Sequence, residues 1–151
     1  MEKPVKHPGK RRHARELAIQ FLYQFDLGGG TLDESLPLFW QTQTDITDPV
    51  RVFAEDLIRG CATHRETIDV QLRKYTEHWE LPRMAAVDRN ILRLAIYEMT
   101  CRDDIPPVVS INEAVEIAKR YSTHESGAFV NGILDRLRGD LTRPARTASG
   151  K

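Results

Sequence analysis

The sequence predicts an all-α fold, and three observations support this prediction. Apolar residues recur at helical spacing through most of the 151-residue chain. No segment alternates between apolar and polar residues in the way that a half-buried strand does. The composition, 40% hydrophobic and 29% charged, is typical of a compact globular protein. We therefore expect about six or seven helices of ordinary length.

Three helical segments are predicted in the first half of the chain. The first runs from Arg11 to Leu27 and ends at a triple glycine. A shorter helix covers residues 33–43, with Asp33 as its N-cap. A long stripe of apolar residues from Val50 to Tyr75 then predicts one long helix or two nearly coaxial helices, interrupted at Gly60.

Three more helices are predicted in the second half. Pro82 marks the start of the first of them, which ends before a Pro–Pro pair. Ser110 and Glu113 have the spacing of a capping box, which predicts the start of the next helix. The last helix is predicted to end at Gly139.

Charge is unevenly distributed, although 22 basic residues balance 22 acidic ones. Residues 1–15 carry a net charge of +5 and residues 136–151 a net charge of +4, so the segment between them carries −9. This pattern is typical of a protein whose terminal arm meets a polyanion, although basic ends can also serve solubility alone. We predict a flexible basic arm at 1–10, one helical domain at 11–139 and a disordered basic tail at 140–151.

The residues that usually carry enzymatic or metal chemistry do not form a recognisable pattern. The glycines at 28–30 are not followed by the Gly-Lys-Ser/Thr of a phosphate-binding loop. The five histidines lack partners at metal-ligand spacing, and Cys61 and Cys101 lack CxxC spacing. No apolar run approaches the roughly 20 residues that span a bilayer, and the N-terminus lacks the apolar core of a signal peptide. We therefore predict a cytoplasmic protein that is not an enzyme, with no metal, cofactor or membrane partner.

The N-terminal end of the first predicted helix is a candidate binding site. Arg11 and Arg15 lie four residues apart and extend one helical row into a region with no apolar residue to pack. Arginine-rich segments commonly order on RNA, because phosphate neutralisation releases counterions and guanidinium planes stack on unpaired bases. A solvated run of charge is the alternative.

Four other residues have two interpretations each. Ile19 and Tyr23 lie opposite the core stripe of the first helix, so either a second partner covers them or the helix is buried on all sides. Asp88 lies within an apolar stripe, where it either caps the helix or meets a basic partner. The neighbours of Phe129 predict that it is buried, and base stacking is the alternative.

Four strings of residues carry a family resemblance: RRHARELAIQFLYQ, VDRNILRLAIYEM, INEAVEIAKRY and FVNGILDRL. In their order and spacing they closely resemble the NusB family of bacterial transcription antitermination factors. The resemblance implies an all-helical protein of two three-helix bundles that share the first helix region. Residues 28–48 and the tail after Gly139 contribute nothing to it.

The resemblance also implies a function and a set of partners. NusB-like proteins pair with NusE, a ribosomal protein of the S10 family, and the pair binds the boxA element of nascent RNA. That complex joins NusA and NusG on RNA polymerase and suppresses premature termination in ribosomal RNA operons, with no catalytic step. The main alternative is an RNA-binding module related to that of ribosomal RNA cytosine methyltransferases, and a second is a homodimeric protein scaffold.

The resemblance further implies which residues bind each partner. Those expected to contact RNA lie at the start of the first helix and at the turn before the last one: Lys10, Arg11, Arg12, Arg15, Glu125 and Phe129. Tyr23, Tyr75 and Asp88 fall where the NusE-binding face is expected, and Ile19 lies beside Tyr23 as a further apolar contact.

Overall fold

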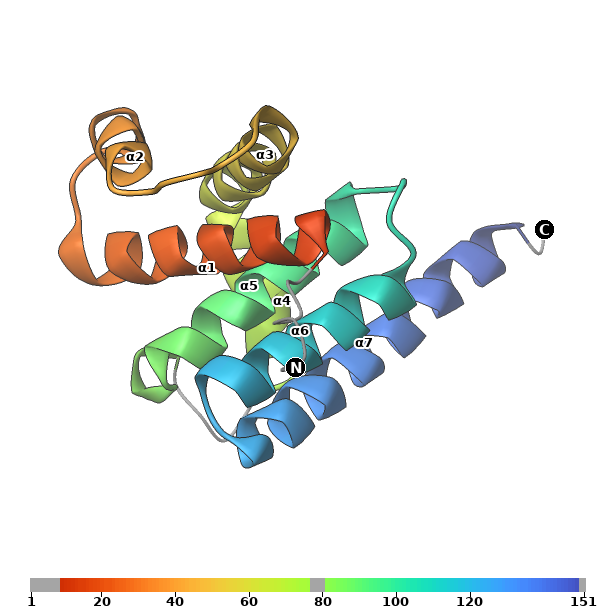
Figure 1. Ribbon diagram of the computed structural model, residues 1–151. Coiled ribbons are helices and arrows are strands. Elements are labelled where there is room, and N and C mark those ends of the chain that lie inside the picture. Colours follow the sequence, from red (N-terminus) through yellow and green to blue (C-terminus); the bar gives the residue numbers. More distant parts are fainter. Residues whose placement is uncertain (1–8, 77–80, 150–151) are drawn as a thin grey trace, which may run out of the picture. The chain divides into compact units, whose positions relative to one another are not determined.

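The computed structural model describes residues 9–76 and 81–149, with side chains to residue 141 (Figure 1). The predicted basic arm therefore lies almost entirely outside the described residues. In the described ranges the regular structure comprises seven α-helices and one short 3₁₀-helix, which confirms the all-α prediction. The chain divides into two compact units, residues 1–59 and 60–151.

The first unit contains α1 (Lys10–Gly28), α2 (Leu32–Gln41) and most of α3 (Asp48–Thr63). As predicted, α1 ends at the triple glycine. Gly29 and Gly30 have φ angles of 80° and 89°, a left-handed conformation that glycine adopts without the steric cost of a Cβ atom.

The cap of α2 differs from the prediction. Thr31, not Asp33, is the N-cap, and Thr31 Oγ1 accepts a hydrogen bond from the backbone N–H of Glu34 at 3.2 Å. Glu34 Oε1 accepts one in return from the Thr31 N–H at 3.4 Å. This reciprocal capping box starts the helix at Leu32 and places Asp33 in its first turn, where a carboxylate favours the helix dipole.

Aromatic side chains form the core between α1 and α2, and α2 is tied to α3 by a polar contact. The ring of Phe21 lies 5.4 Å from that of Phe25 and meets Phe39 edge-on at the same centroid distance. Trp40 Nε1 donates to Glu55 Oε2 at 3.0 Å, which satisfies the indole N–H and links the two helices.

The second unit contains the last turn of α3, α4 (Arg65–Arg73), the 3₁₀-helix Leu81–Arg83, α5 (Ala86–Cys101), α6 (Pro107–Tyr121) and α7 (His124–Ser149). Figure 1 shows α6 and α7 side by side and running in opposite directions, joined by a short turn. Every residue of α5 from Asp88 to Met99 is buried. A helix buried on all sides forms the centre of its unit.

Three predicted boundaries are wrong. The long apolar stripe divides into α3 and α4 at His64 rather than at Gly60, although the Gly60 and His64 carbonyls still accept helical hydrogen bonds across the division. Pro82 belongs to the 3₁₀-helix, so α5 starts later than predicted. Gly139 lies within α7, whose backbone is helical to Ser149, so the helix extends into the segment predicted to be a disordered tail.

The predicted capping box at Ser110 is also wrong. α6 begins at Pro107, whose fixed φ suits the first helical position and whose missing N–H has no cost there. Ser110 therefore lies inside the helix, and its Oγ donates to Glu98 Oε1 of α5 at 2.7 Å. Glu98 is 1% exposed, so this donor serves a buried carboxylate instead of a helix end.

Gly60 allows close packing between α3 and α5. A Cβ atom at this position would overlap the ring of Tyr97, which is itself buried. The glycine therefore sustains a helix–helix contact despite its low helix propensity.

We predict that Gly60→Ala lowers the free energy of unfolding by about 1–3 kcal/mol, because the new methyl group displaces the ring of Tyr97. Urea unfolding measures this change. The matched control is Gly132→Ala in α7, where nothing lies within 4 Å of the added atom. That variant should gain about 0.5–1 kcal/mol from helix propensity. A stabilised Gly60→Ala variant would contradict the packing argument.

Candidate nucleic-acid interface

The N-terminal end of α1 forms a basic surface. Lys10 and Arg11 are exposed, Arg12 is partly exposed, and the first turn contains no acidic residue. Gly9 precedes the helix and supplies no side-chain cap. The unpaired N–H groups of a helix start already carry a partial positive charge, so three cations here cost helix stability and favour the approach of an anion.

Arg11 and Arg15 share one aromatic neighbour. The guanidinium carbon of Arg11 lies 4.5 Å from the centroid of Phe53 in α3, and that of Arg15 lies 5.5 Å from it. The prediction that these arginines extend into a region without an apolar residue is therefore wrong. Arg15 is only 3% exposed, whereas Arg11 lies at the surface. No local sequence pattern indicates Phe53, because it lies on another helix.

The turn between α6 and α7 carries the second set of predicted residues. Glu125 is exposed, and Phe129, one helical turn later, is half-buried next to the fully buried Val130. Thr123 Oγ1 accepts a hydrogen bond from the Ser126 N–H at 3.0 Å and so fixes the first turn of α7. Glu125 and Phe129 therefore extend from an ordered helix start.

Asp88 is connected to this turn. It is 7% exposed, and its Oδ2 accepts a hydrogen bond from Ser126 Oγ at 3.0 Å. Ser126 Oγ in turn lies 2.9 Å from Ser122 Oγ and accepts from Thr123 Oγ1 at 3.1 Å. The interpretation of Asp88 as a helix cap is wrong, because Ala85 is the N-cap of α5 and no side chain caps it.

The second oxygen of Asp88 is an exception within the structure. Oδ1 is buried, and within the described part of the chain it has no hydrogen-bond partner. An unsatisfied buried acceptor is costly, so a further hydrogen-bond donor at this oxygen would be favourable. No sequence pattern indicates Ser126, which is a small polar residue among many.

The three other predicted partner residues differ in their availability. Tyr23 is 37% exposed, whereas Ile19 is 6% exposed and is covered by the chain itself. Tyr75 is half-buried: its hydroxyl donates to Asp140, and the guanidinium carbon of Arg136 lies 5.2 Å from its ring centroid. Tyr23 and Asp88 therefore offer the clearest unfilled contacts of this set.

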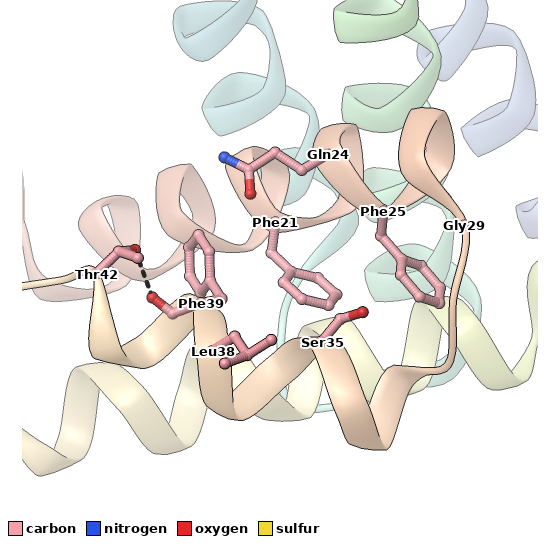
Figure 2. A pocket seen from close by; sticks show the side chains of 8 residues that line it. All are labelled: Phe21, Gln24, Phe25, Gly29, Ser35, Leu38, Phe39 and Thr42. Atoms are coloured by element: carbon pink, nitrogen blue, oxygen red, sulfur yellow. Dashed lines mark hydrogen bonds between the residues drawn. The ribbon is translucent and has the colours of Figure 1, made fainter.

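The first unit also contains an open pocket between α1 and α2. Its volume is about 450 Å³, and Figure 2 shows apolar side chains of both helices on its walls. Eight residues line it: Phe21, Gln24, Phe25, Gly29, Ser35, Leu38, Phe39 and Thr42. Thr42 Oγ1 is occupied by the Phe39 carbonyl, to which it donates at 2.7 Å. The lining has no acid, base or thiol, so no lining side chain could serve as the base that activates the hydroxyl of Ser35 or Thr42 as a nucleophile.

The remaining chemically reactive groups do not assemble into a centre in the part of the chain that is described. There, no cluster of three or more His, Cys, Asp or Glu side chains could hold a metal ion, and no helix is long and apolar enough to cross a membrane. The thiol of buried Cys61 donates to the Arg93 carbonyl at 3.8 Å, and burial raises its pKa. Because the thiolate is the reactive form, Cys61 is an inert packing residue.

Comparison with known proteins identifies the family. The model of the NusB family matches residues 12–138. A transcription antitermination protein NusB from Desulforapulum autotrophicum is 50% identical over 131 residues, which cover 86% of this chain and 92% of the relative. A second relative of the same name, from Anaeromyxobacter sp., is 47% identical and covers 87% of this chain and 92% of its own length.

Solved structures agree with these matches. NusB from T. maritima superposes with a TM-score of 0.76 at 41% identity, covering 87% of this chain and 91% of that one. A structure of the antitermination factors NusB and NusE in complex with dsRNA matches with the same TM-score at 28% identity, covering 84% and 94%. The family model and the relatives extend over most of the sequence, and this chain therefore belongs to the NusB family.

Proposed function

We propose that this protein is an RNA-binding transcription antitermination factor. Together with a NusE-type protein of the S10 ribosomal family, it would bind boxA-like single-stranded RNA and support processive transcription of ribosomal RNA operons. The observation that carries the proposal is the exposed basic first turn of α1, whose side-chain charges add to that of the helix N-terminus. The names of the relatives and the matching complex of NusB, NusE and RNA support it.

RNA contacts in this proposal come from two kinds of group. Lys10, Arg11 and Arg12 neutralise phosphates, which provides affinity without sequence selection. Phe129 offers a partly exposed ring for base stacking, and Glu125 offers an exposed carboxylate that accepts a hydrogen bond from a base or a sugar hydroxyl. The fixed first turn of α7 supports this role, because it limits the backbone freedom that this segment loses on binding.

The NusE-type partner would bind through the acidic part of the chain. Ribosomal proteins of this kind are usually basic, and residues 16–135 carry a net charge of −9. Tyr23 supplies an exposed aromatic contact, and Asp88 Oδ1 would accept a hydrogen bond from a lysine or arginine of the partner. Ile19 is covered and the hydroxyl of Tyr75 is already engaged, so each would contribute to partner binding only within its own unit.

In the cell the protein would act in the cytoplasm as an accessory subunit with no catalytic step and no cofactor. NusA, NusG and RNA polymerase would complete the assembly. A homodimeric scaffold and a module of the methyltransferase type are the competing functions. Light scattering measures whether the protein is a dimer, and RNA gel shifts with and without the NusE homologue measure whether it binds RNA. A dimer without RNA affinity would be a scaffold and would contradict the proposal.

The basic first turn predicts a strong salt dependence. If Lys10, Arg11, Arg12 and about one further cation of the basic arm each neutralise a phosphate, log K falls with log[salt] at a slope of about −3, since each contact on a single strand contributes about −0.7. Replacing Lys10, Arg11 and Arg12 together by Gln should make the slope shallower by about 2. Fluorescence anisotropy with boxA-like single-stranded RNA, and in parallel with a duplex, measures this slope.

The matched control replaces three exposed cations, Arg65 and Arg73 of α4 and its C-cap residue Lys74, none of which is proposed to contact RNA. This variant has the same net charge as the first one and should keep the wild-type slope. An equal flattening in both variants would show that only overall charge matters.

Phe129→Ala is predicted to weaken RNA binding by about 1–3 kcal/mol, the usual contribution of a base–aromatic stack. Because the ring is half-buried, thermal stability should change less than for a core phenylalanine, whose loss costs about 3–5 kcal/mol. Phe129→Tyr keeps the ring and should restore most of the affinity. Unchanged RNA binding together with a collapse in the melting temperature would assign Phe129 to the core.

The proposed partner contacts, one in each unit, are tested by Tyr23→Ala and Asp88→Asn against the purified NusE homologue. Tyr23→Ala should raise the dissociation rate, because an exposed aromatic is a common anchor of an interface. Asp88→Asn keeps the shape and removes the charge, so it should weaken binding in a salt-dependent way. Ser126→Ala removes the internal hydrogen bond of Asp88 but keeps its charge, so its salt dependence should match wild type. Wild-type affinity in both of the first two variants would place the interface elsewhere.

A further inference from the structure

The ring of Phe53 lies beneath two arginines that differ in exposure. Arg15 is 3% exposed and its guanidinium carbon lies 5.5 Å from the ring centroid, whereas Arg11 is at the surface and lies at 4.5 Å. Arg11 and Arg15 belong to α1 and Phe53 to α3, within the same unit. The three side chains therefore form a cluster. Within it Arg15 is buried, the ring of Phe53 is half-buried and Arg11 is exposed.

Two like charges on adjacent turns of a helix repel each other, and this repulsion tends to drive the exposed one into solvent. The face of an aromatic ring carries partial negative charge and attracts both guanidinium groups. Because this attraction is stronger where water is excluded, the buried Arg15 holds the ring more firmly than an exposed residue could. Phe53 is thereby fixed as a surface on which Arg11 rests.

A guanidinium held over a ring still has its N–H groups at the edge of the plane. These groups match the oxygens of a phosphate in a two-pronged geometry. A free arginine side chain loses rotamer freedom when it binds, whereas one already held on a ring loses less. A contact of this kind therefore raises the affinity of an arginine for phosphate without adding another charge.

We propose that Arg15 and Phe53 form a platform that positions Arg11 for contact with RNA phosphate. In this arrangement Arg15 acts through Phe53 and does not itself touch RNA. The proposal rests on the RNA-binding function proposed above and assigns a role to Phe53, a residue outside the basic segment.

Phe53→Leu is the principal test, since it keeps an apolar side chain and removes the aromatic face. The affinity for boxA-like RNA should fall by about 3- to 10-fold, the effect of restoring freedom to one long side chain. The slope of log K against log[salt] should stay unchanged, because the number of phosphate contacts is the same. Phe53→Tyr should restore most of the affinity. Val52→Ala, at an adjacent residue that is 68% exposed, is the matched control and should bind as wild type.

A double-mutant cycle separates positioning from a general loss of structure. In an Arg11→Gln background, Phe53→Leu should cause no further loss of RNA affinity, whereas structural damage would reduce it again. Circular dichroism and the melting temperature are recorded for each variant. If Phe53→Leu does not fold, Arg11→Lys is used as the test instead. This variant keeps the positive charge of an exposed residue and removes its planar guanidinium group. It too should lower affinity without changing the slope.

Arg15→Gln distinguishes the platform from direct contact. A positioning role predicts weaker binding with an unchanged salt slope, whereas a phosphate contact predicts a slope shallower by about 0.7, as for Arg11→Gln. A shallower slope for Arg15→Gln, or wild-type affinity for Phe53→Leu and Arg11→Lys, overturns the inference while leaving the RNA-binding function intact. Absence of RNA binding by the wild-type protein, with and without the NusE homologue, overturns the proposed function instead.

Discussion

The second unit depends on the burial of α5, because a helix without an exposed face must satisfy all of its charged groups inside the protein. Arg93 does so with a two-pronged pair to Asp69 of α4, at 2.8 and 3.0 Å. Glu98 accepts from Ser110 of α6, and Arg89 donates to two backbone carbonyls that precede the helix. Each of these groups would be costly if left unpaired, so the pairs determine which segments surround α5.

Asp88 meets the same requirement only in part, because only one of its two carboxylate oxygens has a hydrogen-bond partner in the described residues. One oxygen is used by Ser126 at the start of α7, while the other is buried without a partner in the described residues. A folded chain keeps such a group when the cost is repaid elsewhere, for example by binding. Through Ser126, Asp88 is also connected to the turn that carries Glu125, so one side chain contacts both the structural centre and a surface of proposed function.

The first unit departs from the usual charge preference of a helix at the N-terminal end of α1. Lys10, Arg11 and Arg12 occupy the turn where acidic residues normally stabilise a helix. The ring of Phe53 offsets part of the repulsion at Arg11 by attracting its guanidinium group. The positive potential that remains attracts a polyanion. The cations in the first turn of α1 therefore weaken the isolated helix but favour RNA binding.

The sequence by itself determined the all-α class, the end of α1 at its glycines and the position of the basic segment, because periodicity and glycine conformation are local properties. The tertiary structure decided which side chains are available. Ile19 is covered while Tyr23 is exposed, although both belong to one helix face in the sequence. Ser110 serves a carboxylate from another helix, and Arg11 rests on Phe53 of α3. Burial and pairing depend on groups far apart in the chain, and these meet only when the helices pack.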